Sequence, residues 1–336
     1  MVGAKSKLDI EEGVNAIEEM VSDIEDLYEI ASRFRKLDKI YTIGCGSSYW
    51  LSYFMAEFIR KASWDVQPVV ASDFYFGNFP VDGKTLVVAF SQSGETSETI
   101  KAFKQAKSLG AQTLAIVNKK KSSLAKLSDI YYVTPVGKEN ILATKTFDSA
   151  LLAAYAIAKG FNNEAVSDVK VLPKILKRAL RLNTGPIVDA LSGQQSCYTI
   201  GIGTDLAAAG ELGVKLGEGA LIQTSTLPAP EMSHGPKANC SGKIVILVAM
   251  QLKYSKIYKN IIKELNKAGA KVIVLAPLKV DYPADIIYEL SGTNEIGAIG
   301  AVKLAQRIAV DTAVARGLDP DSPPTLKKFV TREDLS

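Results

Sequence analysis

Residues 86–103 read LVVAFSQSGETSETIKAF, which is an apolar run, then six mostly small and polar residues, then a helical pattern. The apolar run predicts a buried strand, and the pattern after the polar residues predicts a helix. Strands that alternate with helices in this way are typical of an open parallel sheet covered on both faces. In such sheets ligands bind beyond the carboxyl ends of the strands, where this polar loop is expected to lie.

The strand–turn–helix pattern occurs in two similar halves of the chain. SCYTIGIGTD at residues 196–205 has the same pattern as KIYTIGCGSS at residues 39–48. In the same order, KIVILVA corresponds to KTLVVAF, and AKVIVLA corresponds to AQTLAIV. We therefore expect an α/β protein of two tandem doubly wound, flavodoxin-like units with parallel sheets, over residues 1–165 and 166–336.

Composition and charge exclude several classes of protein. The 336 residues are 47% apolar and carry 40 Lys and Arg against 36 Asp and Glu, a bias too weak to indicate nucleic acid or an anionic membrane. Three scattered cysteines indicate no disulfide framework, and a single histidine cannot form a multi-histidine metal site. No motif for a metal ion or an organic cofactor is present in the sequence, so we expect a protein without either.

The N-terminal segment and the apolar runs bear on localisation. Residues 10–35 predict one amphipathic helix, and residues 1–20 are rich in glutamate and have no apolar core typical of a signal peptide. The longest apolar run, Ile244–Met250, is far shorter than the roughly 20 residues that a membrane span needs. We therefore expect a cytoplasmic protein.

The polar loop has the composition of an anion-binding site. Its hydroxyl and amide donors are Ser91, Gln92, Ser93 and Thr96. A helix that starts here presents free N–H groups and the positive end of its dipole, which together suit a phosphate. Helix capping is the alternative interpretation, but a cap needs only one such side chain. The second half has Met250-Gln251-Leu252 in place of this loop, which argues against a mere folding requirement.

Two glycine-containing turns are expected to border the phosphate. Gly94 lets the backbone approach an anion without a Cβ in the way. The turn Gly44-Cys45-Gly46-Ser47-Ser48 follows the first strand and is expected to border the same site. It lacks the third glycine of the dinucleotide-binding fingerprint.

The second half carries candidate acid–base residues. Glu211, Lys215 and Glu218 fall at i, i+4 and i+7 of an expected helix, so they share one face. A solvent-exposed row of salt bridges is the alternative, but the many glycines of this helix favour close packing, since each costs up to about 1 kcal/mol relative to alanine. One carboxylate can move a proton between adjacent carbons, which makes a carboxylate of this row a candidate acid–base group. The single histidine, His234, lies in a proline-rich loop and has an unperturbed pKa suited to acid–base work.

Six motifs resemble those of one family, in the same order along the chain. They are CGSS, SQSGET, ATKTF, VKLGE, EMSHGP and LKKFVT. The sequence resembles the isomerase half of glutamine–fructose-6-phosphate aminotransferase and its single-chain relatives, the sugar isomerase (SIS) domain deaminases and isomerases of phosphosugars. The likeness extends from about residue 40 to the end of the chain.

The resemblance implies a homodimer of chains with two SIS units each, and it implies roles for named residues. The residues implied to hold a sugar 6-phosphate are Ser48, Ser91, Gln92, Ser93 and Thr96. Glu218 would move a proton between C1 and C2, and His234 of the neighbouring subunit would open the sugar ring. Lys328 would lie beside the anomeric end, with Lys215 as an auxiliary lysine. Possible further substrate contacts are Gly46, Ser47, Ala143 and Glu231. Glu231, which is near His234 in sequence, could also orient the imidazole or compete for the catalytic role.

The chain departs from the family pattern at two places. Where the family reads VASTK, Leu142-Ala143-Thr144-Lys145 lacks the phosphate-side serine. No glutaminase segment is recognised, since residue 2 is valine and not the nucleophilic cysteine. The resemblance therefore favours the degradative reaction of glucosamine-6-phosphate deaminase, which releases fructose 6-phosphate and ammonia. A phosphosugar isomerase, a fructosamine-6-phosphate deglycase and a non-catalytic sugar-phosphate-binding protein are the open alternatives.

Overall fold

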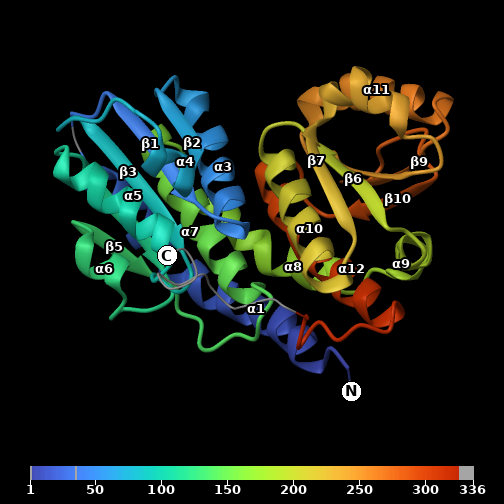
Figure 1. Ribbon diagram of the computed structural model, residues 1–336, viewed down its shortest axis with the longest axis horizontal. Coiled ribbons are helices and arrows are strands. Elements are labelled where there is room, and N and C mark those ends of the chain that lie inside the picture. Colours follow the sequence, from blue (N-terminus) through green and yellow to red (C-terminus); the bar gives the residue numbers. More distant parts are fainter. Residues whose placement is uncertain (1, 35, 325–336) are drawn as a thin grey trace. The chain divides into compact units, whose positions relative to one another are not determined.

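The computed structural model describes residues 2–34 and 36–324 and contains two five-stranded sheets, each fully parallel (Figure 1). The first sheet has the order β2-β1-β3-β4-β5, and the second has the order β7-β6-β8-β9-β10. The strands of the first sheet are β1 (Lys39–Gly44), β2 (Val66–Val70), β3 (Thr85–Ser91), β4 (Gln112–Val117) and β5 (Ile130–Val133). The second sheet consists of β6 (Ser196–Gly201), β7 (Gln223–Pro228), β8 (Ile244–Val248), β9 (Lys271–Pro277) and β10 (Ile286–Leu290). Both orders are flavodoxin-like, so the predicted α/β fold with two copies of one doubly wound unit is confirmed.

Helices alternate with the strands, as the sequence predicts. Those before and around the first sheet are α1 (Ala4–Ser22), α2 (Ile24–Glu29), α3 (Ser47–Ile59), α4 (Ala71–Phe76), α5 (Ser97–Ser108), α6 (Ser123–Leu127) and α7 (Lys145–Asn162). Those that follow are α8 (Leu172–Ala179), α9 (Gly185–Ser192), α10 (Thr204–Ala220), α11 (Ser255–Lys267) and α12 (Asn294–Ala315). Within the described ranges, no helix combines the length and the apolar character needed to cross a bilayer.

The chain divides into two compact units, each with one sheet. The first-sheet unit comprises Asn15–Glu139 and Lys145–Asp168. The second-sheet unit comprises the described residues up to Val14, the short segment Asn140–Thr144 and the described residues from Val169 onward. Each unit therefore takes in segments that are distant in sequence.

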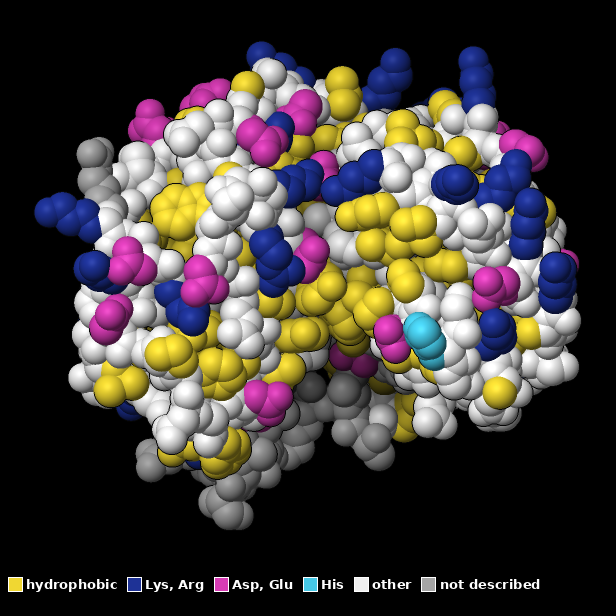
Figure 2. All heavy atoms as spheres, turned by 90° about the horizontal axis from the view of Figure 1, so that it is seen from above, with side chains coloured by type: hydrophobic (Ala, Val, Ile, Leu, Met, Phe, Trp, Pro, Cys, Tyr) yellow, Lys and Arg dark blue, Asp and Glu magenta, His cyan; other side chains and the backbone are white. Residues whose placement is uncertain are grey.

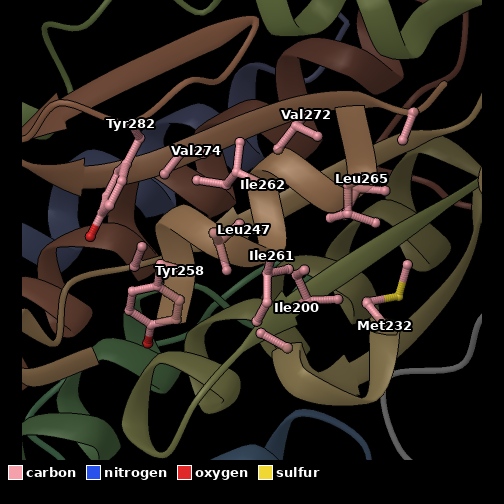
Figure 3. Packing of buried hydrophobic residues seen from close by; sticks show 14 of the residues in the cluster. Ile200, Met232, Leu247, Tyr258, Ile261, Ile262, Leu265, Val272, Val274 and Tyr282 are labelled. Atoms are coloured by element: carbon pink, nitrogen blue, oxygen red, sulfur yellow. The ribbon is translucent and has the colours of Figure 1, made fainter. Parts of the chain in front are cut away.

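Each unit has its own apolar core. In the second-sheet unit, Ile200 and Leu247 on the strands lie in one buried cluster with Ile262 and Leu265 of α11 (Figure 3). In the first-sheet unit, Phe103 of α5 belongs to a separate buried cluster. Burying one such side chain contributes about 1.5–3 kcal/mol, so these clusters fix the helices on the sheets and thereby the loops at the carboxyl edges.

The Gly-x-Gly turns of the two units have the same backbone conformation. Gly46 precedes α3 with φ 56° and ψ −129°, and Gly203 precedes α10 with φ 60° and ψ −128°. Residues with a Cβ rarely adopt this conformation, so both glycines are required by the tight passage from strand to helix. The turn is thus a requirement of the fold and does not by itself indicate a ligand.

Residues 10–35 do not form the single helix that the pattern predicts. Helix α1 begins before residue 10, because the carboxylate of Asp321 accepts hydrogen bonds from the N–H groups of Lys5 and Ser6, at 3.0 and 2.7 Å. These are donors that the first turn of a helix leaves without an intrahelical partner. The helix ends at Ser22, whose hydroxyl donates to a backbone carbonyl of the last turn at 2.6 Å and so competes with the helical hydrogen bonds. Helix α2 and a short 3₁₀ turn follow.

Candidate active site

The polar loop lies between β3 and α5, at the carboxyl edge of the first sheet. The Ser91 hydroxyl accepts a hydrogen bond from the N–H of Gly94 at 3.1 Å and lies 3.2 Å from the Thr96 hydroxyl. The Ser93 hydroxyl accepts one from the N–H of Glu95 at 3.1 Å. Thr96 is the N-cap of α5, yet its side chain makes no capping hydrogen bond. The hydroxyls therefore shape the loop, and Ser93, which accepts a bond, keeps its own proton for donation.

Gly94 is required by a neighbour that the sequence does not indicate. Its φ is +63°, and a Cβ at this position would lie 2.2 Å from the Ser122 hydroxyl oxygen. Two hydrogen bonds hold the loop against the start of α6. The N–H of Leu124 donates to the Gly94 carbonyl at 3.0 Å, and the N–H of Ser123 donates to the Glu95 carboxylate at 2.8 Å. The loop is therefore a rigid element of the first-sheet unit.

The turn after β1 leaves the same edge of the sheet as the polar loop. Strands β1 and β3 are parallel neighbours, so the segments that follow them lie at one edge. In this turn Gly46 is exposed, and Ser47 and Ser48, which open α3, are half-buried. The structure thus brings the candidate residues of both segments to one edge of the first sheet.

The corresponding edge of the second sheet is filled by buried side chains. Asp205 stands second in α10, as Ser48 stands second in α3. Its carboxyl oxygen accepts hydrogen bonds from the N–H of Gln251 at 3.0 Å and from the Tyr258 hydroxyl at 2.7 Å. The Gln251 amide in turn donates to the Thr204 hydroxyl at 2.7 Å. Burial raises the pKa of Asp205 to about 8. The repeated backbone therefore carries two chemically different edges.

Helix α10 holds an ion-paired row of side chains. The Lys215 ammonium nitrogen lies 3.2 Å from a carboxylate oxygen of Glu211 and 2.9 Å from one of Glu218. The Glu211 and Lys215 side chains are 0% and 1% exposed, so a solvent-exposed row of salt bridges is not what the spacing produces. Burial by itself would lower the pKa of Lys215, but the two carboxylates outweigh it and raise the pKa above its usual value. Of the three side chains in this row, only that of Glu218 is substantially accessible to solvent, at 29%.

The glycines of α10 allow the close packing that the sequence suggests. A Cβ at Gly213 would lie 2.7 Å from the Thr226 hydroxyl and 3.1 Å from that of Thr199. These threonines stand on β7 and β6, and their hydroxyls are 2.8 Å apart. The helix therefore lies directly on the sheet at this point, which fixes the row of charged side chains.

The remaining candidates are spread over other segments. His234 lies between two 3₁₀ turns and is exposed, as its cyan side chain in Figure 2 shows. The backbone N–H of His234 donates to the backbone carbonyl of Glu231 at 3.1 Å, but among the described residues their two side chains share no hydrogen bond. Ala143 is half-buried in the segment that joins the second-sheet unit. Lys328 lies outside the described residues.

Comparison with known proteins identifies the family. The SIS domain family model matches residues 33–159 and 190–281. The chain belongs to the SIS domain family. Over 321 residues it is 27% identical to the glutamine–fructose-6-phosphate aminotransferase (isomerizing) of Sulfurisphaera tokodaii, covering 94% of this chain and 54% of that protein. This SIS chain therefore spans about half the length of the curated relatives that it matches.

Two solved SIS structures have the same fold. One is the C-terminal domain of glucosamine–fructose-6-phosphate aminotransferase from Francisella tularensis, with a TM-score of 0.83 and 24% identity over 93% of this chain and 97% of that one. The other is glucosamine-6-phosphate deaminase from Thermotoga maritima, with a TM-score of 0.83 and 24% identity over 98% of this chain and 100% of that one. The two-unit architecture is thus shared over nearly the entire SIS chain.

Two residues beside the candidate site carry no signal in the sequence. Ser122 determines why residue 94 must be glycine. Glu139, between β5 and α7, accepts a hydrogen bond from the Gln92 amide at 3.0 Å. Neither residue stands in a motif, and each acts on a loop that is distant in sequence, so no local signal could have found it.

Proposed function

We propose that this SIS chain is a glucosamine-6-phosphate deaminase, which converts glucosamine 6-phosphate and water into fructose 6-phosphate and ammonia. The observation that carries the proposal is the row on α10. There an accessible carboxylate, Glu218, is held 2.9 Å from a buried ammonium, that of Lys215. A carboxylate fixed in this way and open to solvent is suited to take a proton from carbon and return it.

The proposed chemistry needs one proton to move between adjacent carbons. In the open-chain sugar, Glu218 takes the proton from C2 and returns it to C1, while the amine nitrogen loses a proton and the C1 carbonyl oxygen gains one. This leaves a hydroxyl at C1 and an imine at C2. Water hydrolyses this imine, so that the C–N bond breaks and ammonia leaves. The Lys215 ammonium donates a hydrogen bond to the Glu218 carboxylate and limits its rotation, which places the base before the substrate arrives.

The proposed role of the first-sheet unit is to bind the phosphate. The hydroxyls of Ser91, Ser93 and Thr96, with Ser48 in the turn after β1, would donate hydrogen bonds to the phosphate oxygens. The rigid loop and the first turn of α5 support this role, because they supply donors without rearrangement. Binding energy gathered at the phosphate accelerates the reaction only where it orients C1 and C2.

The names of the relatives support this substrate class. One solved structure of the same fold is a glucosamine-6-phosphate deaminase, and the curated relatives are aminotransferases named for fructose 6-phosphate. Another neighbour, from Escherichia coli, is a tagatose-6-phosphate ketose/aldose isomerase. All three names describe chemistry on a sugar 6-phosphate or its amino form.

The proposal is tested by measuring both products. The protein is incubated with glucosamine 6-phosphate, and ammonia and fructose 6-phosphate are each quantified by a coupled assay. We expect equal amounts of both, and we expect Glu218→Gln to lower kcat by at least about 100-fold, the usual contribution of a general base. Glu25→Gln, on the exposed face of α2, is the matched control. Wild-type protein that releases no ammonia, or a Glu218→Gln variant with normal kcat, would refute the proposal.

We further propose a homodimer in which His234 of one subunit serves the site of the other. The exposure of His234 supports this arrangement, since the side chain is available to a second chain. Mixing two inactive variants, Glu218→Gln and His234→Ala, would then create one intact site in each mixed dimer and restore about a quarter of wild-type activity. A mixture that stays inactive although mixed dimers form would show that each subunit uses its own histidine.

The proposed role of Lys328 is to act at the anomeric end of the sugar. Replacing it with methionine keeps the length and apolar stem of the side chain but removes the ammonium. We expect kcat to fall while the Kd for fructose 6-phosphate changes little. An unchanged kcat would remove Lys328 from the proposed site.

A further inference from the structure

The carboxylate of Glu139 joins the polar loop to the start of α7. Glu139 lies between β5 and α7 and is half-buried. One of its carboxylate oxygens accepts a hydrogen bond from the Gln92 amide nitrogen at 3.0 Å, and the other accepts one from the N–H of Thr146 at 3.0 Å. The Thr146 hydroxyl donates to the same carboxylate. All three residues belong to the first-sheet unit.

The carboxylate is held in place by α7. Thr146 is the second residue of this 18-residue helix, so its N–H has no partner within the helix and points out of the N-terminus. A negative charge near this end is favoured by the helix dipole. Glu139 therefore serves as a cap from outside the helix. Because Thr146 is only 3% exposed, the position of the carboxylate is fixed by the core of the unit.

A fixed carboxylate determines which way the Gln92 amide faces. An ionised carboxylate only accepts hydrogen bonds, so the amide must turn its nitrogen, and not its oxygen, toward Glu139. The amide nitrogen carries two hydrogens, and the second remains available for another acceptor. The backbone of Gln92 is fixed as well, because its carbonyl accepts a hydrogen bond from the N–H of Asn118 at 3.1 Å. The side chain can therefore not exchange its donor for its acceptor without losing the contact with Glu139.

We propose that Glu139 is a positioning residue for phosphate binding, which orients the Gln92 amide so that it presents an N–H to the anion. This inference rests on the proposed function, in which Gln92 contacts the phosphate. The orientation is set before the ligand binds, so the entropy of ordering a flexible glutamine is not lost on binding. Gln92 released from Glu139 could present its oxygen instead, which repels a phosphate.

A double-mutant cycle on Glu139 and Gln92 tests the inference. The Kd for fructose 6-phosphate is measured by calorimetry for the wild type, Glu139→Gln, Gln92→Ala and the double variant. We expect Glu139→Gln to raise Kd about tenfold, which corresponds to about 1.4 kcal/mol. Gln92→Ala should raise Kd by a similar factor. In the Gln92→Ala background, Glu139→Gln should have no further effect on Kd, because the side chain that it orients is gone.

A control variant separates orientation from folding. Thr146→Val removes a hydroxyl that donates to the same carboxylate but leaves the contact between Glu139 and Gln92. We expect it to lower the thermal stability without raising Kd. The inference would be overturned if Glu139→Gln raised Kd by the same factor with and without Gln92. It would also be overturned if Glu139→Gln left Kd unchanged while Gln92→Ala weakened binding. A Gln92→Ala variant that binds normally would instead overturn the proposed role of Gln92.

Discussion

Replacing Gly94 with alanine tests how closely the polar loop packs against Ser122. The positive φ of Gly94 costs an alanine about 1–2 kcal/mol. The new Cβ would also lie 2.2 Å from the oxygen and 2.5 Å from the Cβ of Ser122, so Ser122 must move. Ser122 is the N-cap of α6, where its hydroxyl accepts a hydrogen bond from the N–H of Ala125 at 3.4 Å. Loss of such a cap costs about 1 kcal/mol, so the free energy of unfolding should fall by about 2–3 kcal/mol.

The assay is urea unfolding followed by circular dichroism, with two comparison variants. Gly317 has a φ of +75°, and a Cβ there would have no neighbour within 4 Å among the described residues, so Gly317→Ala should lose only the backbone contribution of about 1–2 kcal/mol. Adding Ser122→Gly to Gly94→Ala removes the close contact, and glycine at an N-cap costs only a few tenths of a kcal/mol. The double variant should therefore be more stable than Gly94→Ala. Equal losses for Gly94→Ala and Gly317→Ala, or no recovery in the double variant, would refute the packing argument.

Three further predictions concern ionisable side chains. Lys215→Met removes one partner of a buried ion pair and should lower the free energy of unfolding by about 3–5 kcal/mol, whereas adding Glu211→Gln should recover part of this loss in the same urea assay. The pKa of Asp205 is raised to about 8, so the folded state keeps a proton that the unfolded state releases. Stability should therefore fall as pH rises from about 4 to about 8, by up to about 1.4 kcal/mol per pH unit from this group, and Asp205→Asn should flatten the dependence of Tm on pH. Burial opposes ionisation of Asp321, but hydrogen bonds from Lys5 and Ser6 outweigh it and lower its pKa. Its contribution to stability should thus be present above about pH 4 and be lost at lower pH, so that Asp321→Asn lowers Tm by several degrees at pH 7 and by less at pH 3.

The repeated sequence pattern predicts the fold because each strand and helix has its own local signal. The match between residues 39–48 and 196–205 leads directly to two sheets of the same strand order. The boundaries of α1 are missed because its start depends on Asp321, a partner from the far end of the sequence. Hydrophobic periodicity contains no information about such a partner.

The candidate site is predicted in its residue types but not in its environment. The spacing of Glu211, Lys215 and Glu218 correctly predicts a shared face, yet spacing alone does not show that two of the three are buried. Burial follows from the packing of the whole helix on its sheet, which depends on many residues at once. Likewise, the composition of the polar loop predicts donors, while Glu139, which accepts a hydrogen bond from the Gln92 amide, stands 47 positions away from Gln92.

The most direct test of the central claim is a calorimetric titration of the Glu218→Gln protein, which should bind substrate without converting it. We expect fructose 6-phosphate to bind and unphosphorylated fructose to bind at least about 100-fold more weakly. Replacing both Ser91 and Ser93 with alanine should abolish this preference, because hydrogen bonds to a charged group contribute about 1.5–3 kcal/mol each. Equal affinity for the two sugars, or an undiminished preference for the phosphorylated one after both serines are replaced, would contradict the claim that this loop binds the phosphate.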